Sequence, residues 1–208
     1  MLADLVLPLE CGGCGAPGTR WCEACQRVIA ARADEPLLVT PRVDPGVPVL
    51  SLGRYAGPRR QAIVALKERG RADLAAPLGG ALRTGLTRLI TWGVVPTPLA
   101  LVPAPTRATS ARRRGGDPVT RMARLAAVPG TDVVAALRMR AFTKDSVGLS
   151  ADARQRNVAG RIRLRRCVAG DVVVVDDIVT TGATASESVH VLQTSGARVL
   201  AVLAIAHA

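Results

Sequence analysis

Two adjacent aspartates, Asp176 and Asp177, follow a run of four valines and precede a loop with three threonines around one glycine. The valines, residues 172–175, predict a strand buried on both faces, as in a parallel sheet covered by helices. Two carboxylates at the end of such a strand repel each other unless a positive charge lies nearby. This strand, acidic pair and turn, placed before a predicted helix, together indicate a functional site.

The loop from Thr180 to Thr184 has the composition of an anion-binding turn. Its backbone N–H groups precede a helix N-terminus, where the helix dipole and the threonine hydroxyls favour negative charge. The aspartates can accept hydrogen bonds from hydroxyl groups. A ligand with a phosphate at one end and a vicinal diol at the other, such as ribose 5-phosphate, fits both features. The alternative is an ordinary buried strand with a polar turn. The chain has no Gly-Lys pair for a P-loop, and no G-x-G-x-x-G pattern follows a predicted strand.

Four cysteines near the N-terminus form the pattern C-x₂-C-x₇-C-x₂-C: Cys11, Cys14, Cys22 and Cys25. Two such pairs supply four thiolates, the set that a tetrahedral structural Zn²⁺ prefers. We therefore predict a structural zinc site here. Disulfides or a redox pair are the alternatives, and a cytoplasmic chain makes both less common. The fifth cysteine, Cys167, is predicted to be a small buried residue.

Alternating strand and helix patterns predict an α/β fold with a mostly parallel sheet. Strands are expected at 47–55, 99–105, 131–139, 172–177 and 198–206, and helices at 58–69, 72–92, 108–127, 151–157 and 184–195. Ligands of such sheets bind at the carboxyl ends of the strands, where the acidic pair stands. We divide the chain into a zinc-binding module (1–30), a proline-rich linker (31–48) and the α/β domain (49–208).

The overall composition restricts the possible partners. The 208 residues carry a net charge of +12, nearly all of the positive charge is arginine, and aromatic residues make up 2%. Arginine suits phosphorylated ligands, nucleic acid or acidic partners, although solvated surface arginines would give the same totals. Scarce aromatics argue against a base-stacking platform. With no apolar run long enough for a membrane span and no signal-peptide pattern at the start, we expect a cytoplasmic protein.

The stretch 172–184 resembles the phosphoribosyl pyrophosphate (PRPP) signature of type I phosphoribosyltransferases: four hydrophobic residues, two acids, two further residues and T-T-G-x-T. The resemblance implies a type I phosphoribosyltransferase-like fold in which Asp176 and Asp177 are catalytic and bind the ribose hydroxyls. It also implies a 5′-phosphate site made of Thr180, Thr181, Gly182, Ala183 and Thr184. A nitrogen nucleophile or a related base would displace pyrophosphate from the anomeric carbon, with Mg²⁺ neutralising the leaving group.

A four-cysteine module joined to a PRPP-type domain is similar to the layout of the ComF family, which is associated with DNA uptake in competent bacteria. The similarity covers residues 54–71, 101–107, 112–116 and 148–160. It implies a pyrophosphate loop at Pro103, Ala104 and Pro105. It also implies acceptor or phosphate contacts from Lys67, Arg114, Arg154 and Asn157. The chain departs from the family pattern at 114–119 and around 145–146, on the acceptor side of the expected site.

The resemblance thus implies a PRPP-binding protein that transfers phosphoribosyl to an unidentified acceptor and is linked to DNA uptake. One alternative is a non-catalytic, zinc-stabilised adaptor that binds single-stranded DNA or DNA-uptake proteins; another is a PRPP-sensing regulator. The arginines at 112–114 suit a phosphate clamp, a DNA-contacting patch or plain surface charge. His190 and His207 lie in apolar contexts and are expected to be non-catalytic.

Overall fold

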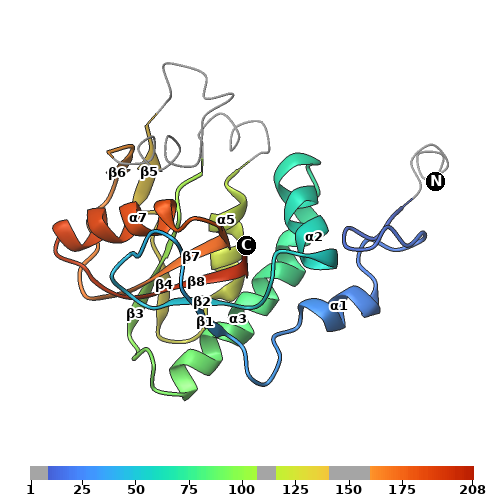
Figure 1. Ribbon diagram of the computed structural model, residues 1–208, viewed down its shortest axis with the longest axis horizontal. Coiled ribbons are helices and arrows are strands. Elements are labelled where there is room, and N and C mark those ends of the chain that lie inside the picture. Colours follow the sequence, from blue (N-terminus) through green and yellow to red (C-terminus); the bar gives the residue numbers. More distant parts are fainter. Residues whose placement is uncertain (1–8, 107–115, 141–159) are drawn as a thin grey trace.

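The computed structural model describes residues 9–106, 116–140 and 160–208. In this part of the chain the central sheet has the strand order β1-β2-β8-β7-β3-β4, and all of its strands except β1 run parallel (Figure 1). Their bounds are β1 (Leu37–Val39), β2 (Val49–Ser51), β3 (Leu99–Pro103), β4 (Thr131–Val133), β7 (Asp171–Val179) and β8 (Arg198–His207). The predicted α/β class with a mostly parallel sheet is therefore confirmed.

Helices cover both faces of the sheet. Their bounds are α1 (Glu23–Ile29), α2 (Gly57–Glu68), α3 (Ala75–Thr91), α5 (Pro118–Ala126) and α7 (Ala183–Thr194), with a short 3₁₀ turn, η2 (Ala72–Leu74), before α3. Helices α2, α3 and α5 pack on one face and α7 on the other (Figure 1). A separate hairpin of β5 (Leu137–Met139) and β6 (Ile162–Leu164) lies beside α7.

Strand β7 shows why the valine run is buried on both sides. Successive side chains of a strand point to opposite faces. Val173 and Val175 belong to the core under α2, α3 and α5, whereas Val172 and Val174 belong to the core under α7. All four are at most 1% exposed, so β7 is a central strand whose end is held in place by two cores.

The helices that follow β3 and β7 cover opposite faces of the sheet. After β3 the chain continues to α5 and on to β4, on one side of β3. After β7 it passes through α7 to β8, on the other side of β7. Since β3 and β7 are neighbours, the strand order reverses between them. In open α/β sheets a crevice forms at such a switch point, outside the carboxyl ends of the two strands.

Several predicted elements differ from the observed ones. Residues 31–48, expected to be a linker, contain the edge strand β1, which pairs with β2. The expected strand 131–139 is two strands, because β4 extends the sheet while β5 leaves it to pair with β6. The helix expected from 108 begins only at Pro118 within the described residues, since Asp117 caps it and Pro118 opens it.

Two further expectations concern single residues and the membrane. Cys167 is exposed rather than buried, because it lies in the connection between β6 and β7. Across the described ranges, none of the helices combines the length and hydropathy needed to cross a membrane. The expected helix at 151–157 lies outside the described residues.

Candidate functional site

A cavity of about 510 Å³ opens at the switch point between β3 and β7. It is lined by Lys67, Glu68, Pro105, Thr106, Met139, Asp176, Asp177, Ile178, Thr180 and Thr184. These residues come from the end of α2, the segment after β3, the hairpin strand β5, and the end of β7 with its loop. The cavity therefore gathers side chains that are far apart in the sequence at the place where this sheet topology favours a ligand.

The acidic pair lies in the second half of β7 and is almost fully buried, with Asp176 8% and Asp177 3% exposed. The backbone N–H of Asp177 donates to Oδ1 of Asp176 at 2.8 Å. Nζ of Lys67 lies 2.5 Å from Oδ2 of Asp177. Lys67 thus supplies the positive charge that two adjacent buried carboxylates require.

Helix α2 brings Lys67 to the acidic pair. Pro58 stands in its first turn, where a proline costs no hydrogen bond, and the backbone stays helical to Glu68. Ala62, Ile63 and Leu66 are buried in the core beneath the helix. Lys67 follows this apolar face in the last turn, so that its ammonium group reaches the end of β7 while its side chain remains 31% exposed.

Burial and charge shift the ionisation of the site in two ways. Burial, reinforced by the neighbouring charge of Asp177, raises the pKa of Asp176 well above its usual value, and Lys67 only partly offsets this. Burial alone would lower the pKa of Lys67, but the carboxylates of Asp177 and Asp176 outweigh burial and raise it. Lys67 is consequently a cation at neutral pH, held against a carboxylate.

The threonine loop continues directly from the acidic strand. Gly182 adopts φ +85° and precedes α7, which begins at Ala183, one residue from the predicted start. A small hollow of about 30 Å³ is lined by residues 178–185 together with Asp176. The N–H of Val43 donates to the carbonyl of Thr181 at 2.8 Å, so the segment after β1 fixes the loop from outside. The loop is a preformed turn at a helix N-terminus, which favours an anion.

The Pro103–Pro105 turn only partly faces the cavity. Pro103 ends β3, and the N–H of Ala104 donates to the carbonyl of Val175 at 2.8 Å, which ties the turn to β7. Both residues are buried, and Pro105 is the member of the turn that lines the cavity. Thr106 follows it and donates to Asp117, the cap of α5, at 3.0 Å.

Sequence reasoning missed four residues that line the cavity: Glu68, Thr106, Met139 and Ile178. Glu68, Thr106 and Ile178 each directly follow a predicted site residue, so adjacency in the sequence was the available signal for them. Met139 adjoins no predicted site residue, because the pairing of β5 with β6 brings it to the cavity. Three predicted contacts, Arg114, Arg154 and Asn157, lie outside the described residues.

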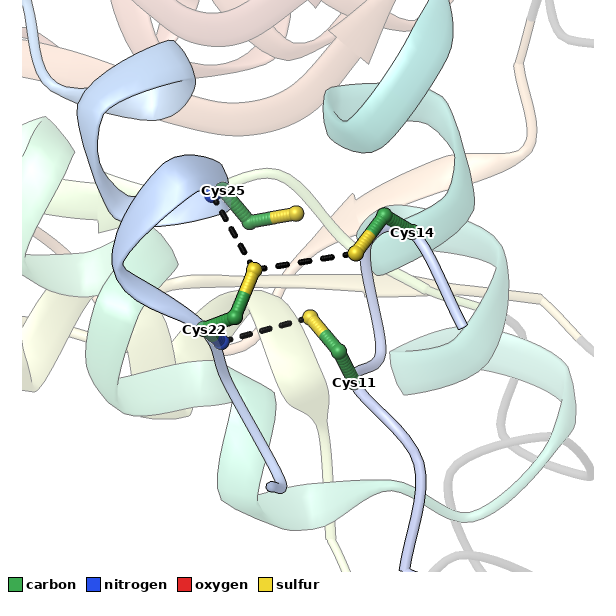
Figure 2. A group of neighbouring side chains, drawn as sticks. All are labelled: Cys11, Cys14, Cys22 and Cys25. Atoms are coloured by element: carbon green, nitrogen blue, oxygen red, sulfur yellow. Dashed lines mark hydrogen bonds between the residues drawn. The ribbon is translucent and has the colours of Figure 1, made fainter. Parts of the chain in front are cut away.

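The four N-terminal cysteines form a second candidate site, whose thiol groups converge in Figure 2. The sulfur atoms of Cys11, Cys14, Cys22 and Cys25 all lie within 4.8 Å of one another. Sγ of Cys14 and Sγ of Cys22 are 3.6 Å apart, far longer than a disulfide bond. Four sulfurs bound tetrahedrally to zinc would be separated by about 3.8 Å. The cluster could therefore hold a metal ion such as zinc.

The surrounding backbone favours thiolates in part of this cluster. The N–H of Cys22 donates to Sγ of Cys11 at 3.3 Å, and the N–H of Cys25 donates to Sγ of Cys22 at 3.4 Å (Figure 2). Burial would raise the pKa of Cys11, but backbone N–H donors outweigh it and lower the pKa to about 6. Burial and the neighbouring thiols raise the pKa of Cys25. A cation at the centre of the cluster would stabilise all four groups as thiolates.

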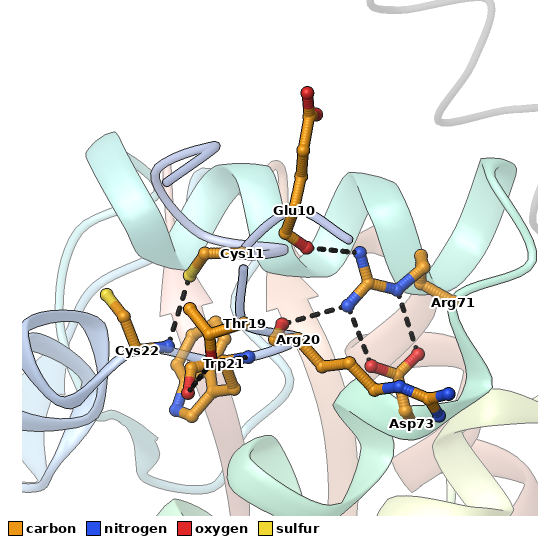
Figure 3. Close-up of polar contacts among 8 residues, drawn as sticks. All are labelled: Glu10, Cys11, Thr19, Arg20, Trp21, Cys22, Arg71 and Asp73. Carbon is orange, nitrogen blue, oxygen red and sulfur yellow. Dashed lines mark hydrogen bonds and ion pairs between the residues drawn. The ribbon is translucent and has the colours of Figure 1, made fainter. Parts of the chain in front are cut away.

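Arg71 attaches the cysteine cluster to the α/β domain, a contact that sequence reasoning missed. Its guanidinium group donates to the backbone carbonyls of Glu10 at 2.9 Å and Arg20 at 2.8 Å (Figure 3). The same group forms a bidentate pair with Asp73, at 2.9 and 2.7 Å. Because Arg71 closely follows α2, the cluster is anchored four residues from Lys67.

Comparison with known proteins does not identify the chain. Its sequence matches no protein-family model, and no curated protein matches it either. The case for a function consequently depends on the acidic cavity, the threonine loop and the cysteine cluster.

Proposed function

We propose that this chain is a PRPP-binding, phosphoribosyltransferase-like protein of the ComF family, with residues 49–208 forming a type I phosphoribosyltransferase-like domain. The observation that carries the proposal is the acidic cavity: Asp176, Asp177 and the threonine loop border one crevice at the switch point of a parallel sheet. A diol-accepting pair and an anion-accepting turn in adjacent positions suit a ribose that carries a 5′-phosphate.

In this proposal, different residues contact the ribose, the 5′-phosphate and the pyrophosphate of PRPP. Asp176 and Asp177 accept hydrogen bonds from the ribose hydroxyls, and the loop from Thr180 to Thr184 receives the 5′-phosphate at the start of α7. Pro105 and Thr106 border the cavity from the segment after β3, the strand that adjoins β7, and we expect the pyrophosphate group beside them. Lys67 offers this anionic ligand a cation at the rim of the acidic pair.

The reaction is a substitution at the anomeric carbon. The bond from that carbon to the pyrophosphate oxygen breaks, pyrophosphate leaves with the electron pair, and a nitrogen nucleophile or a related base forms the new bond. Mg²⁺, for which carboxylate and phosphate oxygens are suitable ligands, would neutralise the leaving group when bound. The chain itself contributes mainly orientation of the sugar and electrostatic stabilisation of the developing charge.

We propose that the cysteine cluster is a structural zinc site. All four donors are thiols, which leaves no open position for a substrate on a tetrahedral ion. Its attachment through Arg71 supports a role in fixing the N-terminal segment against the α/β domain.

Isothermal titration of PRPP with Mg²⁺ tests the proposed function. We expect the wild type to bind and the Asp176→Asn/Asp177→Asn variant to lose binding at least tenfold. The matched control is Asp132→Asn, which removes a carboxylate from an exposed position in β4 and leaves the cavity intact. Absence of binding by the wild type would overturn the proposal.

A second step separates an enzyme from its alternatives. Pyrophosphate release in the presence of a panel of nitrogen bases would establish transfer. PRPP binding without release, together with a change in affinity for a protein partner, would favour a PRPP-sensing regulator. Salt-sensitive binding of single-stranded DNA without PRPP binding would favour the non-catalytic adaptor.

A further inference from the structure

A cluster of hydrogen bonds at the start of α5 borders the acidic cavity. Its centre is the carboxylate of Asp117, which accepts from the hydroxyl groups of Thr106 at 3.0 Å and Thr120 at 2.7 Å. The backbone N–H of Val119 donates to the same carboxylate at 3.2 Å. Thr106 lines the cavity, whereas Asp117, Val119 and Thr120 do not. The cluster therefore connects one wall of the cavity to a helix outside it.

Asp117 makes more hydrogen bonds than a helix cap requires. As the N-cap of α5 it needs one side-chain oxygen for the N–H of Val119, and a serine would serve equally well. In the structure, Oδ1 of Asp117 accepts from both Val119 and Thr106, and Oδ2 accepts from Thr120. Thr106 is 11 positions away in the sequence, so its bond to Asp117 is not part of the local cap.

Helix α5 gives Asp117 a fixed base. Val119, Met122 and Ala123 are fully buried in the core that α5 shares with the sheet. Pro118 opens the first turn of the helix, with a backbone angle that already suits it. Because Asp117 directly precedes this buried turn, a hydrogen bond to its carboxylate restricts where Thr106 can lie.

The segment after β3 has few backbone hydrogen bonds of its own. The N–H of Ala104 donates to the carbonyl of Val175 at 2.8 Å, but Pro105 has no N–H to donate. The N–H of Thr106 donates to no acceptor in the part of the chain that the structure describes. This N–H is available to a ligand, and the hydroxyl bond to Asp117 is what holds Thr106 among the described residues.

We propose that Asp117 is a positioning residue for the pyrophosphate side of the acidic cavity. It holds Thr106 so that the segment after β3 keeps the shape that receives the pyrophosphate group, and the backbone N–H of Thr106 donates to a phosphate oxygen. This inference rests on the proposed function, because it takes PRPP as the ligand. Repulsion between Asp117 and the anionic group would by itself weaken binding. A loss of affinity in a variant without this carboxylate therefore reports position and not charge.

Titration calorimetry with two ligands tests the proposal: PRPP with Mg²⁺, and ribose 5-phosphate, which lacks the pyrophosphate group. Asp117→Ser keeps a capping hydroxyl for α5 but is too short to reach Thr106, and Thr106→Val removes the donor itself. We expect both variants to bind PRPP at least fivefold more weakly, and ribose 5-phosphate as the wild type does. Asp117→Asn retains an oxygen that can accept from Thr106 and Val119, so it should restore the affinity for PRPP.

Thr120→Val is the matched control. It removes the other hydroxyl donor to Asp117, outside the cavity lining, and should bind PRPP like the wild type. In Thr106→Val/Asp117→Ser the two losses should not add, because each single change removes the same hydrogen bond. Thermal unfolding without ligand should be similar for Asp117→Ser and Asp117→Asn, since serine and asparagine are both good N-caps.

The proposal is overturned if Asp117→Ser binds PRPP as tightly as the wild type, or if it loses affinity for ribose 5-phosphate to the same extent. An equal loss of PRPP affinity in Thr120→Val, or additive losses in the double variant, would also overturn it. Failure of the proposed function has a different signature, because the wild type would then bind neither ligand, and the inference would fail with it.

Discussion

At the scale of single residues, Asp176 and Asp177 are neighbours in sequence but have different surroundings. Lys67 compensates the charge of Asp177 directly, whereas Asp176 has the backbone N–H of Asp177 as its donor. Lys67 forms an ion pair with Asp177, whereas at Asp176 the charge of Lys67 and, to a lesser extent, the backbone N–H of Asp177 offset burial only partly. A buried carboxylate that has no ion-pair partner lowers the free energy of unfolding. Proteins retain such a group where it is needed to bind a ligand.

We predict that Asp176→Asn stabilises the fold. Asn preserves the size of the side chain and an oxygen acceptor but removes a buried charge, which should add about 1 kcal/mol or more to the free energy of unfolding at neutral pH. The folded-state pKa of Asp176 is raised well above the ordinary value of an aspartate by burial. Protonated Asp176 therefore contributes fully to the free energy of unfolding below the pKa that it has in the unfolded state. This contribution is lost as pH rises through the pKa that Asp176 has in the folded state.

Urea denaturation at several pH values checks this prediction. The difference between Asp176→Asn and the wild type should be small near pH 4 and should grow toward neutral pH. A difference that shrinks with rising pH would contradict the assignment of the charge cost to Asp176. Asp132→Asn, on exposed β4, should show no such trend.

At the scale of elements, the loop between β7 and α7 depends on a segment far away in the sequence. A Cβ atom on Gly182 would collide with the carbonyl oxygen of Val43 and lie 2.7 Å from Cβ of Pro41. The positive φ of Gly182 adds a second reason for glycine. The stretch after β1 thus packs against the outside of the threonine loop and leaves no room for a side chain at position 182.

We predict that Gly182→Ala lowers the free energy of unfolding by roughly 2–4 kcal/mol, because it combines backbone strain with overpacking. Gly196→Ala is the matched control, since Gly196 also has a positive φ but no atom lies within 4 Å of its added Cβ. Chemical denaturation should show the smaller loss for Gly196→Ala. Equal losses would mean that contact with the segment after β1 is unimportant.

The elements differ in how far the sequence could predict them. The predicted strand 172–177, helix 184–195 and strand 198–206 correspond closely to β7, α7 and β8, because apolar runs and Gly196 mark them locally. The strands β1 and β6 each have three residues and exist through pairing with partners elsewhere in the chain. Helix α1 has seven residues, too short to be stable or recognisable without its tertiary contacts.

At the scale of the whole molecule, the cysteine cluster and the acidic cavity are joined through one short stretch of chain. The side chain of Lys67, in the last turn of α2, contacts the acidic pair. The side chain of Arg71, shortly after the end of α2, contacts the cysteine segment. The two candidate sites were both predicted from local motifs. Their connection could not be, because the carbonyl groups that Arg71 contacts carry no side-chain signature in the sequence.

We predict that Arg71→Ala loosens the N-terminal segment. It removes charge-assisted hydrogen bonds to Glu10, Arg20 and Asp73 from a side chain that is 28% exposed, which should cost roughly 1–3 kcal/mol. A metal-loaded sample should also release its metal faster to a chelator. Arg69→Ala serves as the control, because Arg69 is exposed and only two residues away. Equal release rates for both variants would contradict the anchoring role of Arg71.

The position of Trp21 gives the protein a built-in optical probe of its cysteine cluster. Trp21 directly precedes Cys22 in the sequence, its indole ring lies against Gly13, and its Nε1 donates to Oε1 of Gln26 at 2.8 Å. The only other tryptophan, Trp92, is 49% exposed at the end of α3. In a Trp92→Phe protein, fluorescence excited selectively at tryptophan rather than at Tyr55 would therefore come from Trp21 alone. Its emission would follow metal loading of the N-terminal segment in real time, without an added label.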